Sequence, residues 1–186
     1  MPVSMPVSAP LPDWPTGHAV YGWLALDRRG GWRLKDEPVT HAGLIAFLNT
    51  HYASDPSGHW FVRNGPQRVY VALEYAPLVL RLEPDGRAVA HTGADAGDVR
   101  SAHLDEDGNV LLATARGPGL LDDRDLAAFV AECRGPDGAP ASDEALLGVL
   151  GGGAGVTWRG LALQPIRRAD IPAHFGFEPA PHDRRT

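Results

Sequence analysis

A nine-residue segment that occurs twice constrains the fold of this chain more than any other feature. Leu26–Leu34 and Leu104–Leu112 carry Leu, Asp, Gly and two apolar residues at the same offsets. A shorter version occurs at Asp55–Val62. Asp followed three residues later by Gly is typical of a tight turn, because Asp bonds to the backbone after it and Gly takes a positive φ. The sequence therefore predicts the same turn at three places.

Apolar residues alternate on the C-terminal side of each predicted turn, as Trp32 and Leu34 show in the first copy. Alternation predicts a strand with one buried face. A helical pattern follows in both long copies, with matching apolar stripes. The first helix should begin at Thr40 as N-cap, and the second near Asp122. The two stripes are Leu44, Phe47, Leu48 and Tyr52, and Leu126, Phe129, Val130 and Cys133.

Each copy thus predicts a strand, a turn, a strand and a helix. Further strands are expected at 59–63 and 68–74, a hairpin at 78–82 and 87–91, a strand at 156–163, and short helices at 143–150 and 170–175. The predicted fold class is α+β, with mainly antiparallel strands in hairpins, helices on one face and two related units. The expected organisation is a flexible Pro-rich tail at 1–17, units at 18–82 and 83–178, and a flexible tail at 179–186.

The charge and the cysteine content of the chain limit the classes of partner and the location that we expect. The formal net charge is −6, so nucleic acid is not an expected partner. No run approaches the 18 apolar residues of a membrane helix, so no membrane partner is expected. Cys133 is the single cysteine, which excludes an intrachain disulfide and favours a cytoplasmic location. We interpret Cys133 as a buried apolar residue.

Sequence motifs for catalysis or cofactor binding are missing. The chain has no GxSxG nucleophile motif and no HExxH zinc motif. The glycine run at 151–155 lacks the Lys-Ser or Lys-Thr of a phosphate loop. Asp105–Asn109 begins like a calcium loop, but Val110 and Arg116 replace the Gly and Glu that such a loop needs. We therefore predict no catalytic residues, no metal site and no cofactor.

The most informative polar segment is Asn64–Glu74. Alternation places Val69, Val71 and Leu73 on one face of the predicted strand, and polar residues on the other. An arginine on that face could hold a carboxylate or phosphate beside an aromatic anchor. The alternative is a solvated face with a weak cross-strand ion pair. The predicted ligand-binding residues are Asn64, Gln67, Arg68, Tyr70 and Glu74.

The segment Leu26–Leu82 resembles uncharacterised bacterial domain-of-unknown-function families built from repeated α+β motifs. The resemblance rests on the Asp-x-x-Gly-x-Trp turns, on Leu44-Ile45-x-Phe47, and on Arg68-Val69 leading to Glu74-x-Ala76-Pro77. It implies a similar fold and a role in small-ligand binding for signal transduction. It implies no catalytic residues.

These observations favour a cytoplasmic, non-enzymatic module that binds a small anionic ligand or acts as a regulator in signal transduction. One alternative is a hydrolase-like enzyme whose histidine and carboxylate come from distant positions, for example His41 with an acid. Another is a structural domain that forms a homodimer through an apolar patch.

Overall fold

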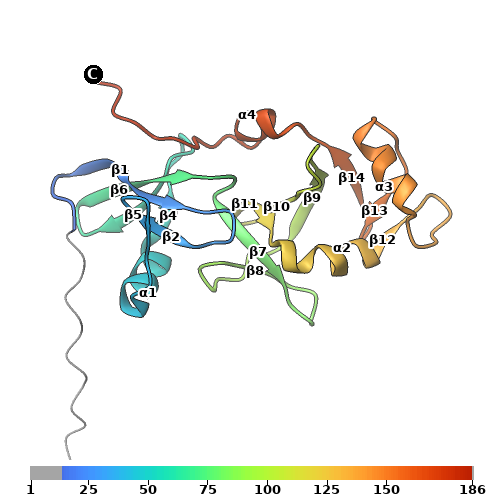
Figure 1. The fold of residues 1–186 in the computed structure, drawn as a ribbon, viewed down its shortest axis with the longest axis horizontal. Helices are drawn as coiled ribbons and strands as arrows, with labels where there is room; N and C mark the ends of the chain where they lie inside the picture. The colour runs from blue at the N-terminus through green and yellow to red at the C-terminus, as the bar shows by residue number, and fades with distance from the viewer. Residues whose placement is uncertain (1–13, 186) are drawn as a thin grey trace, which may run out of the picture.

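The computed structural model describes residues 14–185 and contains two β-sheets arranged side by side along the long axis of the molecule (Figure 1). The first sheet has six strands in the order β3-β2-β1-β6-β5-β4. Its strands are β1 (Ala19–Leu26), β2 (Trp32–Leu34), β3 (Glu37–Pro38), β4 (Tyr52–Ser54), β5 (Trp60–Asn64) and β6 (Gln67–Leu73). Helix α1 (Ala42–His51) connects β3 to β4.

The second sheet has eight strands in the order β12-β13-β14-β9-β10-β11-β7-β8. Its strands are β7 (Leu78–Leu82), β8 (Ala88–Ala90), β9 (Val99–Leu104), β10 (Val110–Thr114), β11 (Gly117–Leu121), β12 (Cys133–Arg134), β13 (Thr157–Trp158) and β14 (Leu161–Pro165). The other elements are the 3-10 turns Asp123–Asp125 and Arg168–Asp170 and the helices α2 (Leu126–Glu132), α3 (Asp143–Leu150) and α4 (Ile171–Phe175).

Six strands of the second sheet follow the order of the first. The run β11-β10-β9-β14-β13-β12 corresponds to β3-β2-β1-β6-β5-β4, with the helices α2 and α1 at equivalent places in the chain. Both runs have a parallel pair at the centre, β9 with β14 and β1 with β6. Most other neighbours are antiparallel, so the fold is the α+β class expected, with mainly antiparallel pairing.

The predicted turns are confirmed, and six hairpin turns share one geometry. In each, a glycine with φ between 78° and 90° donates its N–H to the carbonyl three residues earlier. This is the type I turn with a glycine bulge that suits hairpins. In three of the six the first residue is Asp, whose carboxylate accepts backbone N–H groups of the turn. The glycines are Gly30, Gly58, Gly86, Gly93, Gly108 and Gly138.

The core runs without a break through both sheets. Trp32 and Trp60 are buried, as the alternation predicts, and Phe129 stacks on the buried Trp158 at a centroid distance of 5.0 Å. Cys133 is also buried, as expected, and burial raises the pKa of its thiol to about 11. No helix in residues 14–185 is long and apolar enough to cross a membrane.

Two helix boundaries differ from the prediction. The N-cap of α1 is His41 rather than Thr40, because the His41 Nδ1 accepts the Leu44 N–H at 3.1 Å. Tyr52, assigned to the apolar stripe of that helix, begins β4 instead. Cys133 likewise begins β12. In each case the chain leaves the helix directly into an edge strand, which an apolar stripe alone does not reveal.

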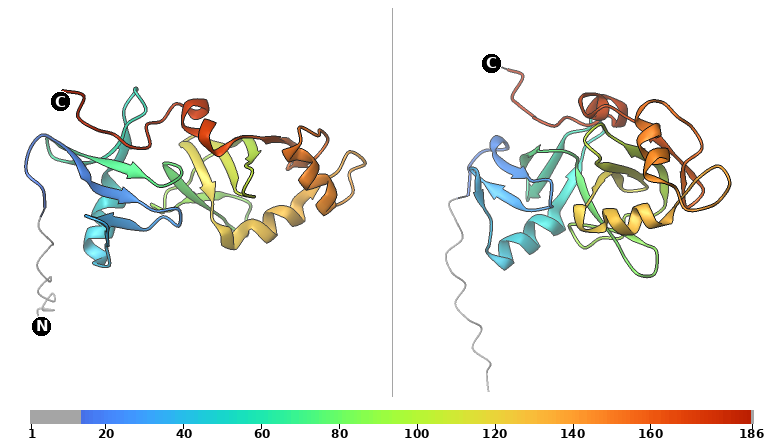
Figure 2. Two further views of the ribbon diagram at one scale, coloured as in Figure 1. Left: turned by 45° about the horizontal axis from the view of Figure 1, so that its top comes forward. Right: turned by 45° about the vertical axis from the view of Figure 1, so that its right-hand side comes forward.

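The predicted strand at 156–163 is a hairpin, β13 and β14, because Arg159 and Gly160 turn the chain with φ of 48° and 79°. The expected boundary between units, at 82 and 83, falls between two strands of one sheet, since β7 pairs with β11. The chain crosses between the sheets at residues 74–77. Helices α1 and α2 lie along one side of the molecule and α4 along the other (Figures 1 and 2), so the helices do not share one face.

The C-terminal segment, residues 176–180, returns from the second sheet to the first (Figure 1). Phe177 is buried in the core. The Glu178 N–H donates to the Gly58 carbonyl at 2.9 Å, and the Leu73 N–H donates to the Pro179 carbonyl at 2.8 Å. Part of the predicted flexible tail at 179–186 is therefore fixed to β6.

Of the predicted tail at 1–17, residues 1–13 lie outside the described residues. The remainder packs on the first sheet. Pro15 is buried, and Trp14 meets Phe47 edge to face at 6.2 Å.

Candidate functional site

The segment predicted to bind a ligand forms the β5–β6 hairpin and the strand that follows. The alternation is as expected, with Val69, Val71 and Leu73 buried. Gln67, however, is also buried. Its side chain accepts the Trp14 indole N–H at 2.7 Å and donates to the carbonyls of Pro15 and Gly17. The Asn64 amide donates to the same Gln67 oxygen at 3.3 Å. The Gln67 amide therefore fixes residues 14–17 to β6, and the Asn64 amide bonds to Gln67.

Aromatic rings occupy the polar face of β6. Tyr70 stacks on Tyr21 with ring centroids 4.6 Å apart and planes within 3°. The Arg68 guanidinium lies over the Phe61 ring, 4.5 Å from its centroid. Arg68 and Tyr70 are both half-buried on this face.

Glu74 lies at the other end of β6, about 20 Å from Arg68 at 3.3 Å per residue. Its carboxylate accepts the Arg28 N–H at 3.0 Å. It also lines a cavity of about 440 Å³ with Tyr75 and Arg168. The structure thus pairs Asn64 with Gln67, places Arg68 and Tyr70 on the opposite face of β6 from Gln67, and separates Glu74 from them.

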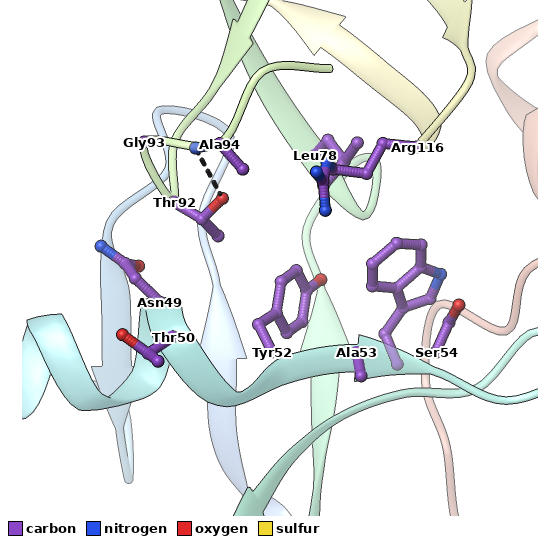
Figure 3. Close-up of a pocket in the computed structure, with 11 residues that line it drawn as sticks. Asn49, Thr50, Tyr52, Ala53, Ser54, Leu78, Thr92, Gly93, Ala94 and Arg116 are labelled. Atoms are coloured by element: carbon purple, nitrogen blue, oxygen red, sulfur yellow. Dashed lines mark hydrogen bonds between the residues drawn. The ribbon is translucent and has the colours of Figure 1, made fainter. Parts of the chain in front are cut away.

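A larger cavity, of about 560 Å³, lies between the two sheets (Figure 3). We call it the inter-sheet cavity. One wall comes from the end of α1, from β4 and from β5, and the other from β7, the β8–β9 loop and the β10–β11 turn. It is lined by Asn49, Thr50, Tyr52, Ala53, Ser54, Trp60, Leu78, Thr92, Gly93, Ala94 and Arg116. Its volume is in the range of small-molecule sites.

The floor of the inter-sheet cavity is aromatic. The ring centroids of Tyr52 and Trp60 are 4.9 Å apart, and the two rings are tilted by 41°. Both residues line the cavity, and the Tyr52 ring points into it (Figure 3). The Tyr52 hydroxyl donates to the Pro77 carbonyl at 2.8 Å, which fixes the ring to the crossing between the sheets. Burial raises the pKa of Tyr52 well above its ordinary value. Tyr52 therefore stays neutral at physiological pH.

Arg116 supplies the charge of the inter-sheet cavity. Among the residues that line it, Arg116 is the one charged side chain. Its Nε–H donates to the Asp95 carbonyl at 2.9 Å, which orients the guanidinium, and within residues 14–185 it forms no ion pair with a carboxylate. Asn49 is already engaged, because its side-chain oxygen accepts the Trp32 indole N–H at 2.7 Å.

His91 lies behind the floor, in ring contact with Trp32 and Tyr52. Its Nδ1 accepts the Val79 N–H at 3.2 Å, so that nitrogen carries no proton. Its buried Nε2 has no hydrogen-bond partner in the described part of the chain. Burial lowers the pKa of His91 to about 4, against a smaller opposing effect of Asp27. His91 therefore joins the sheets as a neutral residue.

The hydrolase alternative finds little support in the arrangement of the histidines. His41 caps α1 through its Nδ1. The Ser101 hydroxyl lies 2.9 Å from the His103 Nε2, but His103 is buried, and burial with nearby His174 lowers its pKa. Neither Ser101 nor His103 lines the inter-sheet cavity. No group of three or more His, Cys, Asp or Glu within residues 14–185 is placed to hold a metal ion.

Sequence reasoning missed the inter-sheet cavity because its residues come from five separate stretches of the chain. The sequence pattern predicts Tyr52 in a helix and Trp60 in the core, and it places Arg116 in no element. The signal that was available is Trp60 itself, an aromatic residue next to the predicted Asp55 turn. Sequence alone does not indicate that Arg116 comes to face it.

The comparisons with known proteins find relatives without an established function. A family model described as "Protein of unknown function (DUF2946)" matches residues 5–182. No curated protein matches the chain. The solved structure of a DUF1285 family protein from Silicibacter pomeroyi DSS-3 is similar, with a TM-score of 0.55 and 12% identity over 87% of this chain and 88% of that one.

A DUF1285 family protein from Shewanella baltica OS155 matches with a TM-score of 0.44 and 21% identity, over 57% of this chain and 89% of that one. At such identities the Silicibacter structure supports the fold alone. The expected resemblance to bacterial families of unknown function is confirmed.

Proposed function

This chain belongs to the family described as "Protein of unknown function (DUF2946)", and from that premise we propose that it is a binding module for a small anionic ligand. The ligand would occupy the inter-sheet cavity. One observation carries the proposal: Arg116 is the single charged residue lining a cavity with an aromatic floor.

The lining residues define the chemistry of the ligand. A guanidinium binds carboxylate and phosphate through charge-assisted hydrogen bonds. In a chain of net charge −6, a cation that has no acidic partner in the described part of the chain is a local positive site. The rings of Tyr52 and Trp60 favour a flat apolar body next to the anionic group. An aromatic or other planar carboxylate meets both requirements.

The same residues favour binding over catalysis. No Asp, Glu, His or Cys is among the residues that line the cavity. Tyr52 keeps its proton, and an arginine is always protonated, so neither is suited to accept a proton near neutral pH. A bound ligand would therefore be held without proton transfer.

A titration with benzoate and indole-3-acetate, followed by amide chemical shifts, tests the proposal. We expect shifts at Tyr52, Gly93 and Arg116 in the wild-type protein. Arg116→Gln should weaken binding about tenfold to a hundredfold, because a hydrogen bond to a charged group is lost. Arg68→Ala is the matched control and should leave the affinity unchanged. Binding that survives Arg116→Gln would contradict the proposal.

The polar face of β6 is the second candidate site. Its support is the Arg68 guanidinium over the Phe61 ring, together with the stacked rings of Tyr70 and Tyr21. If Arg68→Ala abolishes binding and Arg116→Gln does not, this face is the ligand site.

For either site we propose a cytoplasmic regulator in signal transduction, in which the ligand acts by changing how the two sheets pack. A homodimer is a further proposal, tested by light scattering.

We also propose that the two sheets derive from one duplicated unit. The matching strand order and the shared turns support this origin. Structures of more distant family members test it, since the six matched strands of each sheet should be kept together as a set.

A further inference from the structure

One wall of the inter-sheet cavity is an open sheet edge. β4 is the last strand of the six-stranded sheet and pairs with β5 on one side only. The consecutive residues Tyr52, Ala53 and Ser54 all line the cavity. Neighbouring residues in a strand point to opposite faces, so a cavity lined by three in a row runs along the edge of the strand.

The hydrogen-bond pattern shows which backbone groups of β4 are free. Ala53 is opposite Phe61 and Ser54 is opposite Trp60. The Asp55 N–H donates to the His59 carbonyl, so Asp55 and His59 form a hydrogen-bonded pair of the ladder. Such pairs alternate in an antiparallel ladder, so Ala53 is bonded to Phe61, and the N–H and C=O of Ser54 point away from β5. The Tyr52 carbonyl also points to this free edge.

The geometry points to an extended peptide with a free C-terminal carboxylate as the ligand of this cavity. Its backbone would pair with the free edge of β4, adding a short seventh strand to the first sheet. Its carboxylate would bind Arg116. Its last side chain would be apolar and lie on the rings of Tyr52 and Trp60. This inference rests on the proposed function, because it assigns a ligand class to the same cavity.

Charge and size support this occupant. Arg116 is an exposed lining residue that forms no ion pair within residues 14–185, and its charge complements a carboxylate. Three residues of strand extend about 10 Å, which fits a cavity that follows β4 for its whole length. A sheet edge with unpaired N–H and C=O groups is a template for another strand.

The test uses acetyl-alanyl-valyl-phenylalanine and its C-terminal amide, with benzoate as a small acid that has no backbone to pair. At about ten times its Kd, the acid tripeptide should slow hydrogen exchange of the Ser54 amide about tenfold, because the bound state protects that N–H. Benzoate should bind through Arg116 without protecting Ser54. The amide tripeptide should bind at least tenfold more weakly than the acid.

A matched variant isolates the strand pairing. Ser54→Pro removes an N–H that the β4–β5 ladder does not use, so the sheet should stay intact. It should weaken tripeptide binding about fivefold and leave benzoate binding unchanged. A tripeptide with N-methylated amides, tested on the wild-type protein, should show the same loss without any change to the chain.

The outcomes separate the two proposals. If benzoate binds through Arg116 but the tripeptide neither protects Ser54 nor distinguishes acid from amide, the peptide inference is wrong and the proposed function stands. If neither probe binds, both are wrong.

Discussion

The packing of the C-terminal segment against the first sheet predicts unequal effects for the same substitution in two equivalent turns. Gly58 and Gly108 occupy the same position of the same turn, with φ of 82° and 83°. A methyl group on Gly58 would overlap the Gly176 carbonyl oxygen and touch the Phe177 Cα at 3.0 Å. A methyl group on Gly108 would meet nothing within 4 Å. The pair Gly58→Ala and Gly108→Ala therefore isolates the contact with the C-terminal segment.

The expected costs follow from the structure. Both variants force alanine into a left-handed conformation, at about 1 kcal/mol each. Gly58→Ala must also displace the segment that carries the buried Phe177. Exposing that side chain costs about 2 kcal/mol. Displacement also breaks two backbone hydrogen bonds, from the Glu178 N–H to the Gly58 carbonyl and from the Leu73 N–H to the Pro179 carbonyl. Each contributes about 1 kcal/mol to stability. Gly58→Ala should thus destabilise the protein by about 2–4 kcal/mol more than Gly108→Ala.

Urea unfolding of both variants measures the difference, and hydrogen exchange locates it. In Gly58→Ala the amides of Glu178 and Leu73 should exchange faster than in wild type, while Gly108→Ala should leave them unchanged. Equal losses of stability in the two variants, with both amides still protected, would refute this reasoning.

Three further predictions concern buried groups. Tyr75→Phe removes the hydroxyl that donates to the buried Asp105 carboxylate at 2.5 Å. It should lower the free energy of unfolding, measured by urea titration, by about 1–3 kcal/mol. An unchanged free energy of unfolding would contradict the role of this bond. The pKa of His91 is lowered to about 4, so the folded state binds its proton less readily than the unfolded state. Stability should therefore be complete above about pH 6.5 and fall as the pH drops toward 4, and His91→Phe should flatten that slope in acid titrations followed by circular dichroism; an unchanged slope would argue against it. Cys133, buried with a raised pKa, should react with a thiol reagent in urea and not in buffer at pH 8, where fast labelling of the folded protein would contradict its burial.

The hairpins could be predicted from sequence because their information is local. Asp27, Asp55 and Asp105 each bond the backbone of their own turn, and the glycine three residues later takes the positive φ that other residues avoid. Alternation on either side then places Trp32 and Trp60 in the core.

The sheet order and the helix ends depend on distant contacts and were not predictable in the same way. β1 pairs in parallel with β6, and no local pattern specifies that neighbour. Tyr52 fits a helical stripe by spacing, yet its ring contacts Trp60 and His91, and these contacts place it in an edge strand.

The predicted site shows why a polar pattern does not by itself define a binding surface. The alternation of β6 is as predicted, and it also places Gln67 on the buried face, where its side chain bonds to Trp14, Pro15 and Gly17. The sequence predicts a flexible tail at residues 14–17, so it indicates no partner for Gln67. The charge of the inter-sheet cavity comes from Arg116, which follows β10 and faces β4 only once the sheets have packed.

A crystal structure of the protein soaked with benzoate is the most direct test of the central claim, that the cavity between the sheets is an anion-binding site. The benzoate carboxylate should lie within about 2.7–2.9 Å of the Arg116 guanidinium nitrogens, with its ring over Tyr52 and Trp60. Ligand density on the β6 face beside Arg68, with the inter-sheet cavity unchanged, would contradict it.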